Sequence, residues 1–328
     1  MTEVGLGLIG VGWWGGELAE AARRGGTGRV VACYARDPQR RGAFAAEHGC
    51  RAAGDLDELL ADPAVEGVLV ATPHSTHLPL IEAAAAGGRH VFVEKPLTLT
   101  LDEARAALAA TAKAGVVLQV GHHRRRLGAT RRLRQLLDDG VIGTPVALEG
   151  NQSGPNVFRE VPAWRRDSGE SPIGGMTAYG VHVVDTLHYL AGPIRRVSAF
   201  SKAVIGVGDL DDVSVIAFEH EAGPLSTLTT SLALPKIATV GLLGSDAAAW
   251  SLLDGARLAV QRRTDAAPTI EEVEPGDAVA DELNEFDRCI RGEATPETGG
   301  PEGAAVVAVL EAIVESARTG RATDVPKV

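Results

Sequence analysis

The sequence predicts an α/β protein in two parts: a doubly wound parallel sheet, then an α+β domain built on a mostly antiparallel open sheet. Two observations predict the first part. Residues 1–120 alternate short apolar runs with longer alanine-rich segments, and a glycine-rich turn follows the first apolar run. The third observation is a change after Gly121, where the alternating pattern of half-covered strands becomes frequent. A chain of 328 residues has room for about two domains.

In order along the chain, the first part consists of buried strands separated by helices. Short apolar runs without polar alternation are typical of strands covered on both faces. Such strands are expected at 4–9, 30–34, 67–71, 90–93 and 116–120. Helices are expected at 16–24, 39–48, 56–60, 78–86 and 101–113. Thr100 and Glu103 form a predicted capping box for the last helix, and Gly115 ends it.

The second part is expected to begin just after Gly121, so that the domains are 1–121 and 122–328. Helices are expected at 126–137, 283–291 and 304–318. Strands are expected at 146–151, 197–201, 214–218, 225–231, 239–243, 248–252 and 258–261. Residues 151–175 are rich in glycine, proline, serine and charge, which is typical of a long functional loop.

The composition argues against several classes of protein. Lys and Arg total 32 against 43 Asp and Glu, a net charge of −11, so a nucleic-acid partner is not expected. The three cysteines are far apart and fit neither a disulfide framework nor a zinc site, which favours a reducing compartment. No run approaches the roughly 20 apolar residues of a membrane span, and the N-terminus has no basic leader. We expect a cytoplasmic protein with no metal site and no membrane partner.

Residues 10–15 read Gly-Val-Gly-Trp-Trp-Gly, a G-x-G-x-x-G turn between the first strand and the first helix, the context in which this motif binds a dinucleotide. Gly10 permits the tight turn, Gly12 lets a pyrophosphate approach the backbone, and Gly15 allows close packing of helix on strand. The helix N-terminus supplies N–H donors to the phosphates. The first part is therefore a predicted Rossmann domain that binds its cofactor at Gly10, Gly12, Trp13, Trp14 and Gly15. A chance match remains the alternative, because 39 residues are glycine.

The residues after the second strand predict the choice of cofactor. About 20 residues beyond the glycine turn, such domains usually place an acid that binds the ribose 2′-hydroxyl. Ala35 stands there, followed by Arg36, with Arg40 close behind. An arginine can pair with a 2′-phosphate and stack on adenine. NADP is therefore expected to be preferred, with NAD possible if Asp37 serves the ribose instead.

Lysine is rare, with five in the chain, and Lys95 holds the most informative position. Glu94-Lys95-Pro96 follows the strand at 90–93, at the end of the sheet where α/β proteins bind ligands. Desolvation beside another cation lowers the pKa of a lysine toward the range useful for proton transfer. Lys95 is thus a candidate acid–base residue; the alternative is a lysine that only reaches solvent from a sheet edge.

Taken in order, these motifs resemble the Gfo/Idh/MocA oxidoreductases, the family of glucose–fructose oxidoreductase and inositol dehydrogenase. In the first part the likeness is carried by the glycine turn, by residues 71–77 (Ala-Thr-Pro-His-Ser-Thr-His) and by Glu94-Lys95-Pro96. In the second part it is carried by residues 121–125, by Trp164-Arg165, by residues 174–185 and by the tail at 311–320. The resemblance covers nearly the whole chain.

The resemblance implies hydride transfer between a nicotinamide and a substrate alcohol, with Lys95 and His182 sharing the site. Lys95 would exchange the hydroxyl proton, and His182 would relay it or bind the substrate. The implied cofactor residues also include Thr72, Pro73, His74, His77, Glu94 and Lys95. The implied substrate residues are Lys95, His123, Arg124, Trp164, Arg165, Tyr179 and His182. The Lys-Pro peptide of this motif is often cis in the family.

Ala178 departs from the family pattern, which usually has an aspartate four residues before the histidine. Thr177, Tyr179 or Asp185 could compensate in part, although Asp185 lies one turn beyond His182 and is expected to anchor it. The departure weakens any inference of substrate from the glucose and inositol dehydrogenases. The arginines at 124–126, 131, 132 and 134 are expected to form a solvated helix face with one or two substrate or phosphate contacts.

The sequence therefore predicts an NADP-preferring dehydrogenase or reductase that acts on a secondary alcohol or ketone of a sugar, glycoside, cyclitol or related polyol. The alternatives are a lyase or glycosidase that recycles its nicotinamide, an aromatic dihydrodiol dehydrogenase, and a nucleotide-binding sensor without turnover. The resemblance further implies a homodimer or homotetramer formed through the C-terminal sheet.

Overall fold

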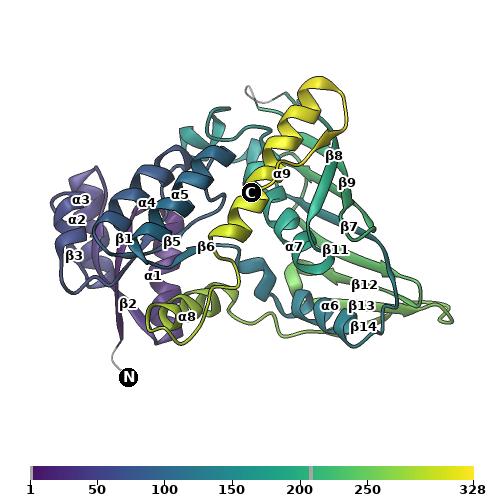
Figure 1. The fold of residues 1–328 in the computed structure, drawn as a ribbon, viewed down its shortest axis with the longest axis horizontal. Coiled ribbons are helices and arrows are strands. Elements are labelled where there is room, and N and C mark those ends of the chain that lie inside the picture. Colours follow the sequence, from purple (N-terminus) through teal and green to yellow (C-terminus); the bar gives the residue numbers. More distant parts are fainter. Residues whose placement is uncertain (1–2, 207–209) are drawn as a thin grey trace. The chain divides into compact units, whose positions relative to one another are not determined.

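A computed structural model of the protein describes residues 3–206 and 210–328, which form two compact units (Figure 1). The first unit contains the chain up to His123 together with Asp277–Ala304. The second contains Arg124–Gly276 and Ala305–Val328. The first unit is thus built from two separate stretches of sequence. Residues 1 and 2 lie outside the described residues.

The described part of the first unit contains a six-stranded sheet in the order β3-β2-β1-β4-β5-β6, with every neighbouring pair parallel. The strands are β1 (Val4–Ile9), β2 (Gly28–Tyr34), β3 (Arg51–Ala52), β4 (Gly67–Val70), β5 (His90–Val93) and β6 (Leu118–Val120). The doubly wound parallel sheet is confirmed. The strand order reverses between β1 and β4, and the crevice at such a reversal is where α/β sheets bind ligands.

Helices cover both faces of this sheet. They are α1 (Trp13–Gly25), α2 (Pro38–His48), α3 (Leu56–Ala61), α4 (His77–Ala86), α5 (Leu101–Ala114) and α8 (Ala278–Ile290). The predicted capping box is present, since the Thr100 side chain accepts from the Glu103 N–H and the Glu103 carboxylate accepts from the Thr100 N–H. Helix α8 packs against α1 and adds Leu283 and Phe286 to the core, which explains why the unit includes a late segment of the chain.

In the described part of the second unit, nine strands follow the order β14-β13-β12-β11-β7-β10-β9-β8-β15, antiparallel apart from the β7–β10 pair. The strands are β7 (Pro145–Ser153), β8 (Ile194–Lys202), β9 (Val213–His220), β10 (Leu225–Ser231), β11 (Ile237–Gly244), β12 (Ala247–Leu252), β13 (Arg257–Arg262), β14 (Thr269–Glu272) and β15 (Thr323–Asp324). The mostly antiparallel sheet is confirmed. β14 and β15 were not predicted, because their residues are largely exposed and carry no apolar pattern.

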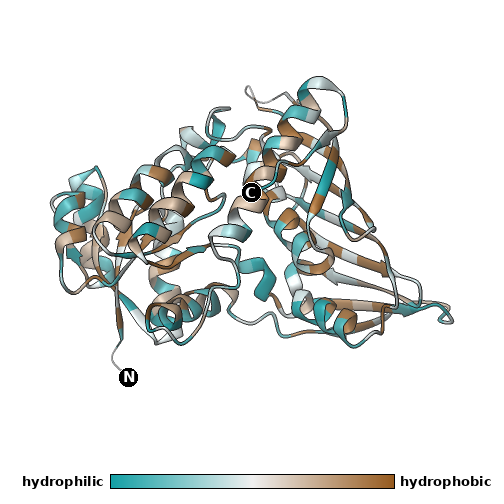
Figure 2. Ribbon diagram, viewed as in Figure 1, coloured by the Kyte–Doolittle hydropathy of each residue, from teal (hydrophilic) through white to brown (hydrophobic). Residues whose placement is uncertain are grey.

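One face of this sheet is covered by helices and the other is open. Helices α6 (Gly128–Asp138) and α7 (Val181–Ala191), with much of α9 (Gly300–Thr319), share a core with the inward residues of the strands. On the opposite face Phe200 is 75% exposed, and its direct neighbour Val215 is 50% exposed. The alternation of hydrophobic and hydrophilic residues along β8 and β9 is visible in Figure 2.

Cys33 and Cys50 are neighbours in the fold, because β3 pairs with β2 directly after Cys50, and both are free cysteines. One expectation needs correction. The arginines at 124–126 do not form a solvated face, since Arg125 and Arg126 are both buried.

No helix among the described residues is long and apolar enough to cross a membrane. Across residues 3–206 and 210–328, no group of three or more His, Cys, Asp or Glu side chains is placed to hold a metal ion.

Candidate cofactor and active site

The glycine turn after β1 leaves no room for side chains at two of its glycines. Gly10 has a φ of 103°, and a Cβ there would overlap the Ala71 carbonyl at the end of β4. A Cβ at Gly15 would overlap the Gly10 carbonyl. The turn therefore closes tightly because these positions are glycine, and α1 starts directly against the sheet.

The backbone of the turn is open at its middle glycine. A Cβ at Gly12 would meet nothing within 4 Å, so a ligand can approach the backbone there. Among the described residues, no side chain caps α1, and its first turn carries no acid. Its N–H groups therefore face an anion site. Trp13 is 79% exposed beside the turn, and Trp14 packs against His123 with ring centroids 5.6 Å apart.

At the end of β2, Arg36 and Arg40 are exposed. Asp37 is the N-cap of α2: its Oδ1 accepts from the N–H groups of Gln39 at 2.9 Å and Arg40 at 3.2 Å. The Arg41 guanidinium donates to the Ala35 carbonyl at 2.9 Å, which stabilises the turn between β2 and α2. The acid that could have served a ribose is thus engaged in starting a helix.

The loops after β4 and β5 lie side by side. The Glu94 N–H donates to the Val70 carbonyl at 3.0 Å, Glu94 is buried, and Lys95 is half-buried. The Lys95–Pro96 peptide is cis. Thr72 and Pro73 are half-buried in the loop after β4, and His74 is buried. His77 does not cap α4, whose N-cap is Thr76; its ring instead contacts main-chain carbonyls.

In the second unit, His182 lies in the first turn of α7, after a π-helical turn at Met176–Gly180. A Cβ at Gly180 would overlap the Met176 sulfur, so a larger residue there would displace the Met176 side chain. π-Helical turns are frequently found at functional sites. His182 is buried, and its carbonyl accepts from the Thr186 hydroxyl at 2.9 Å.

The residues considered as substitutes for the family aspartate have other bonds. The Thr177 hydroxyl donates to the Pro172 carbonyl at 3.0 Å. The Tyr179 hydroxyl donates to Asn156 Oδ1 at 2.7 Å, and burial raises the pKa of Tyr179. Asp185 accepts two hydrogen bonds of 2.8 Å from Arg125.

Trp164 and Arg165 belong to one short 3-10 turn, Ala163–Arg166. The Arg165 guanidinium lies over the Trp164 ring, 4.5 Å from its centroid. The charge of Arg165 also acts on Tyr179, where it opposes the effect of burial on the pKa. The structure therefore brings Trp164, Arg165 and Tyr179 into one neighbourhood of the second unit.

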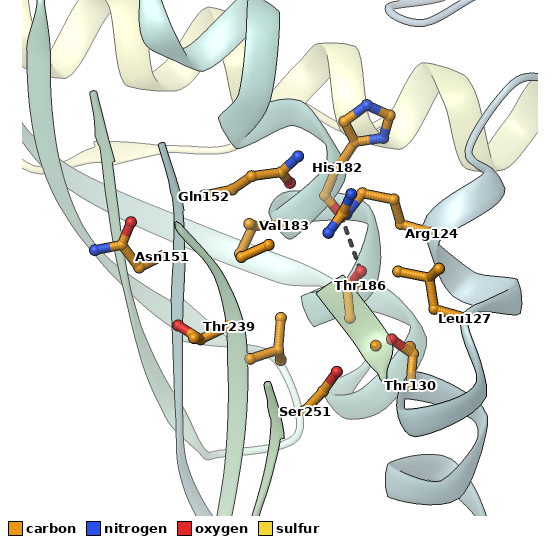
Figure 3. A pocket seen from close by; sticks show the side chains of 13 residues that line it. Arg124, Leu127, Thr130, Asn151, Gln152, His182, Val183, Thr186, Thr239 and Ser251 are labelled. Carbon is orange, nitrogen blue, oxygen red and sulfur yellow. Dashed lines mark hydrogen bonds between the residues drawn. The ribbon is translucent and has the colours of Figure 1, made fainter. Parts of the chain in front are cut away.

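A small, partly open pocket in the second unit is bordered by His182 (Figure 3). It is lined by Arg124, Leu127, Thr130, Asn151, Gln152, His182, Val183, Thr186, Ala238, Thr239, Val240, Ser251 and Gly255. Figure 3 shows the Gln152 amide and the Arg124 guanidinium turned toward the same space below the His182 ring, whereas Asn151 points away. Gln152 is buried, and within residues 3–206 and 210–328 its Oε1 has no hydrogen-bond partner.

Gln152 was not predicted from the sequence. The available signal was its place in β7, two positions beyond Gly150 and four beyond Leu148 on the covered face. A polar residue on that face needs a partner, and a ligand is one way to supply it.

Comparisons with known proteins agree with this geometry. Residues 4–122 match the family model described as "Oxidoreductase family, NAD-binding Rossmann fold", and residues 130–249 match the GFO/IDH/MocA C-terminal domain. D-apiose dehydrogenase from Paraburkholderia graminis is 30% identical over 97% of this chain and 88% of its own length. The chain belongs to the GFO/IDH/MocA oxidoreductase family.

Other relatives of this GFO/IDH/MocA protein cover the whole chain. 1,5-Anhydro-D-fructose reductase from Ensifer adhaerens is 29% identical, over 97% of this chain and 98% of its own. The crystal structure of a levoglucosan dehydrogenase in complex with NADH has the same fold, with a TM-score of 0.91, 21% identity and 100% coverage of both chains. The protein is thus an NAD(P)-dependent oxidoreductase of a family whose members act on sugars and cyclitols.

The arginines that follow β6 in this oxidoreductase form ion pairs, hydrogen bonds and ring contacts within the second unit. Arg124 pairs with Asp254, which Lys236 also contacts at 2.6 Å. Burial raises the pKa of Asp254, but the two cations bring it below its usual value. Arg131 lies over the Tyr189 ring at 5.6 Å and donates to its hydroxyl at 2.9 Å. These contacts fix the segment that enters the pocket wall.

Proposed function

We propose that the protein is an NADP-preferring dehydrogenase or reductase acting on a secondary alcohol or ketone of a sugar, glycoside, cyclitol or related polyol. The observation that carries the proposal is the position of Lys95. It follows β5, whose end is bonded to β4, and β4 in turn closes the glycine turn after β1. A basic side chain thus stands at the edge of the sheet that holds the cofactor turn.

The reaction assigned to Lys95 is proton exchange with the substrate hydroxyl. The bound nicotinamide supplies an acceptor or donor for the hydride at its C4 position. As the C–H hydride leaves the alcohol carbon with its electron pair, Lys95 takes the hydroxyl proton at Nζ and a C=O bond forms. In the reductive direction Lys95 returns the proton to the new alkoxide. The amine must therefore be neutral before oxidation and protonated before reduction.

The second unit is proposed to bind the rest of the substrate. His182, with Arg124 and Gln152, whose Oε1 has no partner among the described residues, offers donors and acceptors suited to a chain or ring of hydroxyls. His123, Trp164, Arg165 and Tyr179 are proposed as further substrate residues. The aromatic and guanidinium surfaces of Trp164 and Arg165 suit the apolar C–H face of a sugar ring.

The NADP preference is proposed from charge at the end of β2. Arg36 and Arg40 are exposed there, and Asp37 is held by α2. Two exposed cations favour a 2′-phosphate over a 2′-hydroxyl, and the N-cap bonds occupy one oxygen of Asp37. Glu94, with Thr72, Pro73 and His74, is proposed to line the nicotinamide half of the same cofactor site.

The test is a panel of sugars, polyols and glycosides with NAD and NADP in parallel, including 1,5-anhydro-D-fructose and D-apiose. Net oxidation or reduction of the nicotinamide is expected, followed by its ultraviolet absorbance. Lys95→Ala should lower kcat by about 10²–10⁴-fold while cofactor binding is retained. Product formed with no change of absorbance would instead indicate a lyase or glycosidase that recycles its cofactor. Turnover unaffected by Lys95→Ala would remove this lysine from the mechanism.

A further inference from the structure

His77 contacts the backbone of two loops at once. It is the first residue of α4, and its side chain is 0% exposed. Nδ1 lies 3.0 Å from the Pro96 carbonyl oxygen and 3.2 Å from that of Leu97, both in the loop after β5. Nε2 lies 3.2 Å from the Thr72 carbonyl oxygen, in the loop after β4. One imidazole therefore joins the two loops that flank the cofactor end of the sheet.

The acceptors indicate how the ring is oriented. A carbonyl oxygen only accepts, so a ring nitrogen bonded to it must carry a hydrogen. Nδ1 faces two carbonyls, one of them at the shortest distance, and we assign the proton of a neutral ring to Nδ1 on that basis. The 3.2 Å approach of Nε2 to the Thr72 carbonyl is then a contact and not a hydrogen bond. Nδ1–H then donates to Pro96, with Leu97 as a second acceptor.

This bond acts on the peptide that follows Lys95. Before Lys95 the chain is held by the sheet, through the bond from the Glu94 N–H to Val70. After Lys95 it is held by His77, through the carbonyl of Pro96. With both neighbours fixed, the main chain at Lys95 is held in place, and this sets the point from which its side chain extends.

The segment that carries His77 is itself rigidly tied. The Thr76 hydroxyl lies 2.7 Å from the Thr72 hydroxyl and 2.6 Å from the Pro73 carbonyl. The short helical turn His74–Thr76 then leads directly into α4. The imidazole therefore connects the loop of Lys95 to the well-bonded segment at the start of α4.

We propose that His77 is a positioning residue that sets the location of the Lys95 amine through the backbone of Pro96. The proposal rests on the proton-transfer role proposed for Lys95. His77 touches neither of the reacting groups; it keeps the amine at the point where the hydroxyl proton is exchanged. Displacement of a catalytic group by about 1 Å is enough to cost on the order of 10²-fold in rate.

Two conservative variants separate this role from general support of the fold. An asparagine amide nitrogen can occupy the place of Nδ1, whereas a glutamine amide nitrogen reaches the place of Nε2. His77→Asn therefore keeps the donor to Pro96, and His77→Gln shifts it toward Thr72. With 1,5-anhydro-D-fructose and NADPH as the assay, kcat is expected to fall about 10- to 100-fold in His77→Gln and far less in His77→Asn. The KM for NADPH should change little in either.

A second measurement needs no substrate. The five lysines of the chain are labelled competitively with acetic anhydride and quantified by mass spectrometry. Lys113, Lys202, Lys236 and Lys327 serve as internal references. The relative rate at Lys95 should change in His77→Gln and be restored in His77→Asn. A residue that only stabilised the fold would lower the melting temperature of both variants and leave the relative labelling of Lys95 unchanged, which would overturn the proposal.

The double variant with Lys95→Ala tests whether His77 acts through the lysine. In that background His77→Gln should cause no additional loss of kcat. A full additional loss would show that His77 acts independently and would refute the proposal. If Lys95→Ala alone leaves kcat unchanged, the proposed function fails instead, and the labelling experiment still decides whether His77 places Lys95.

Discussion

Arg36 and Asp37 are sequence neighbours with opposite roles at the end of β2. The aspartate is committed to α2 by two backbone hydrogen bonds, while the arginine side chain is exposed. The sequence alone left open whether Asp37 would bind the ribose. The N-cap geometry favours the proposal that Arg36 meets a 2′-phosphate, because the competing acid already has its partners.

Arg36→Ala should raise the KM for NADP about 10- to 100-fold, since a charge-assisted bond to phosphate contributes about 1.5–3 kcal/mol. The KM for NAD should change little, because NAD lacks the phosphate. Initial-rate kinetics with both cofactors measures the two values. Arg29→Ala, at the opposite end of β2, is the matched control and should alter neither. An equal effect on NAD and NADP would contradict the assignment.

Where α8 meets the turn before β2, one hydroxyl lies within hydrogen-bond distance of two side-chain oxygens. The Thr27 hydroxyl lies 2.6 Å from both Asn284 Oδ1 and Asp287 Oδ2. A hydroxyl has one hydrogen, so a protonated Asp287 that donates to Thr27 satisfies both contacts. Consistent with this, burial raises the pKa of Asp287 to about 6. Space is tight, since a Cβ at Gly28 would lie 2.6 Å from this carboxylate.

The stability of the Asp287→Asn variant relative to the wild type should increase as the pH rises. The folded carboxyl has a higher pKa than the unfolded one, so the wild type loses stability between about pH 4 and about pH 6 and does not regain it above. An amide does not ionise. The free energy of unfolding of the variant relative to wild type should therefore shift by about 2–3 kcal/mol in its favour from pH 4 to pH 8. Urea unfolding at both pH values measures this shift; a difference independent of pH would contradict it.

Helix α7 is held by a buried ion pair, with Asp185 1% exposed. Asp185→Ala leaves the Arg125 guanidinium buried without its two bonds and should lower the free energy of unfolding by about 3–5 kcal/mol. The exposed pair of Arg318 and Glu315 provides the control, because Glu315→Ala should cost less than about 1 kcal/mol. Thermal and urea unfolding compare the two. Similar costs for both variants would show that the buried pair contributes no more than a surface pair.

The elements show which parts of the fold were predictable. Apolar periodicity placed β1 and β10 at their observed bounds, because each buries a regular set of side chains. It missed β3, which has two exposed residues and depends on its neighbour β2. The contact of Cys33 with Cys50 and the burial of Arg125 are tertiary effects and leave no local pattern. In the candidate site, motifs identified the glycine turn and Lys95, whereas Gln152 required the pairing of β7 with its covering helices.

At the scale of the whole molecule, the open face of the nine-stranded sheet remains to be explained. Phe200, Val215 and Leu225 are all at least half exposed on it. Phe200 and Val215 form a direct cross-strand pair, and Glu219 pairs with Leu225. Adjacent exposed apolar residues on a protein surface commonly mark an interface, and Phe200 and Val215 are such a pair. We propose that this face joins copies of the chain into a homodimer or homotetramer.

The double variant Phe200→Glu, Val215→Glu should dissociate that assembly, because like charges directly opposite each other on the sheet repel and cannot be buried together. Light scattering coupled to gel filtration measures the molar mass. Ile270→Glu, which also replaces an exposed apolar residue but on β14, is the control and should leave the mass unchanged. A wild-type protein that is already monomeric would refute the interface.

Because α8 packs in the first unit, it affects how chimeras of homologous chains must be designed. Leu283 and Phe286 belong to the core that surrounds β1 and α1, although strands β7 to β14 of the second sheet separate them in sequence. A chimera made with a single crossover after His123 would combine the nucleotide half of one parent with the α8 of another and mismatch that core. Exchanging cofactor preference between homologues therefore requires crossovers near 123, 277 and 304 together. The first two junctions are close in space, since the Gly128 N–H donates to the Pro275 carbonyl at 3.3 Å.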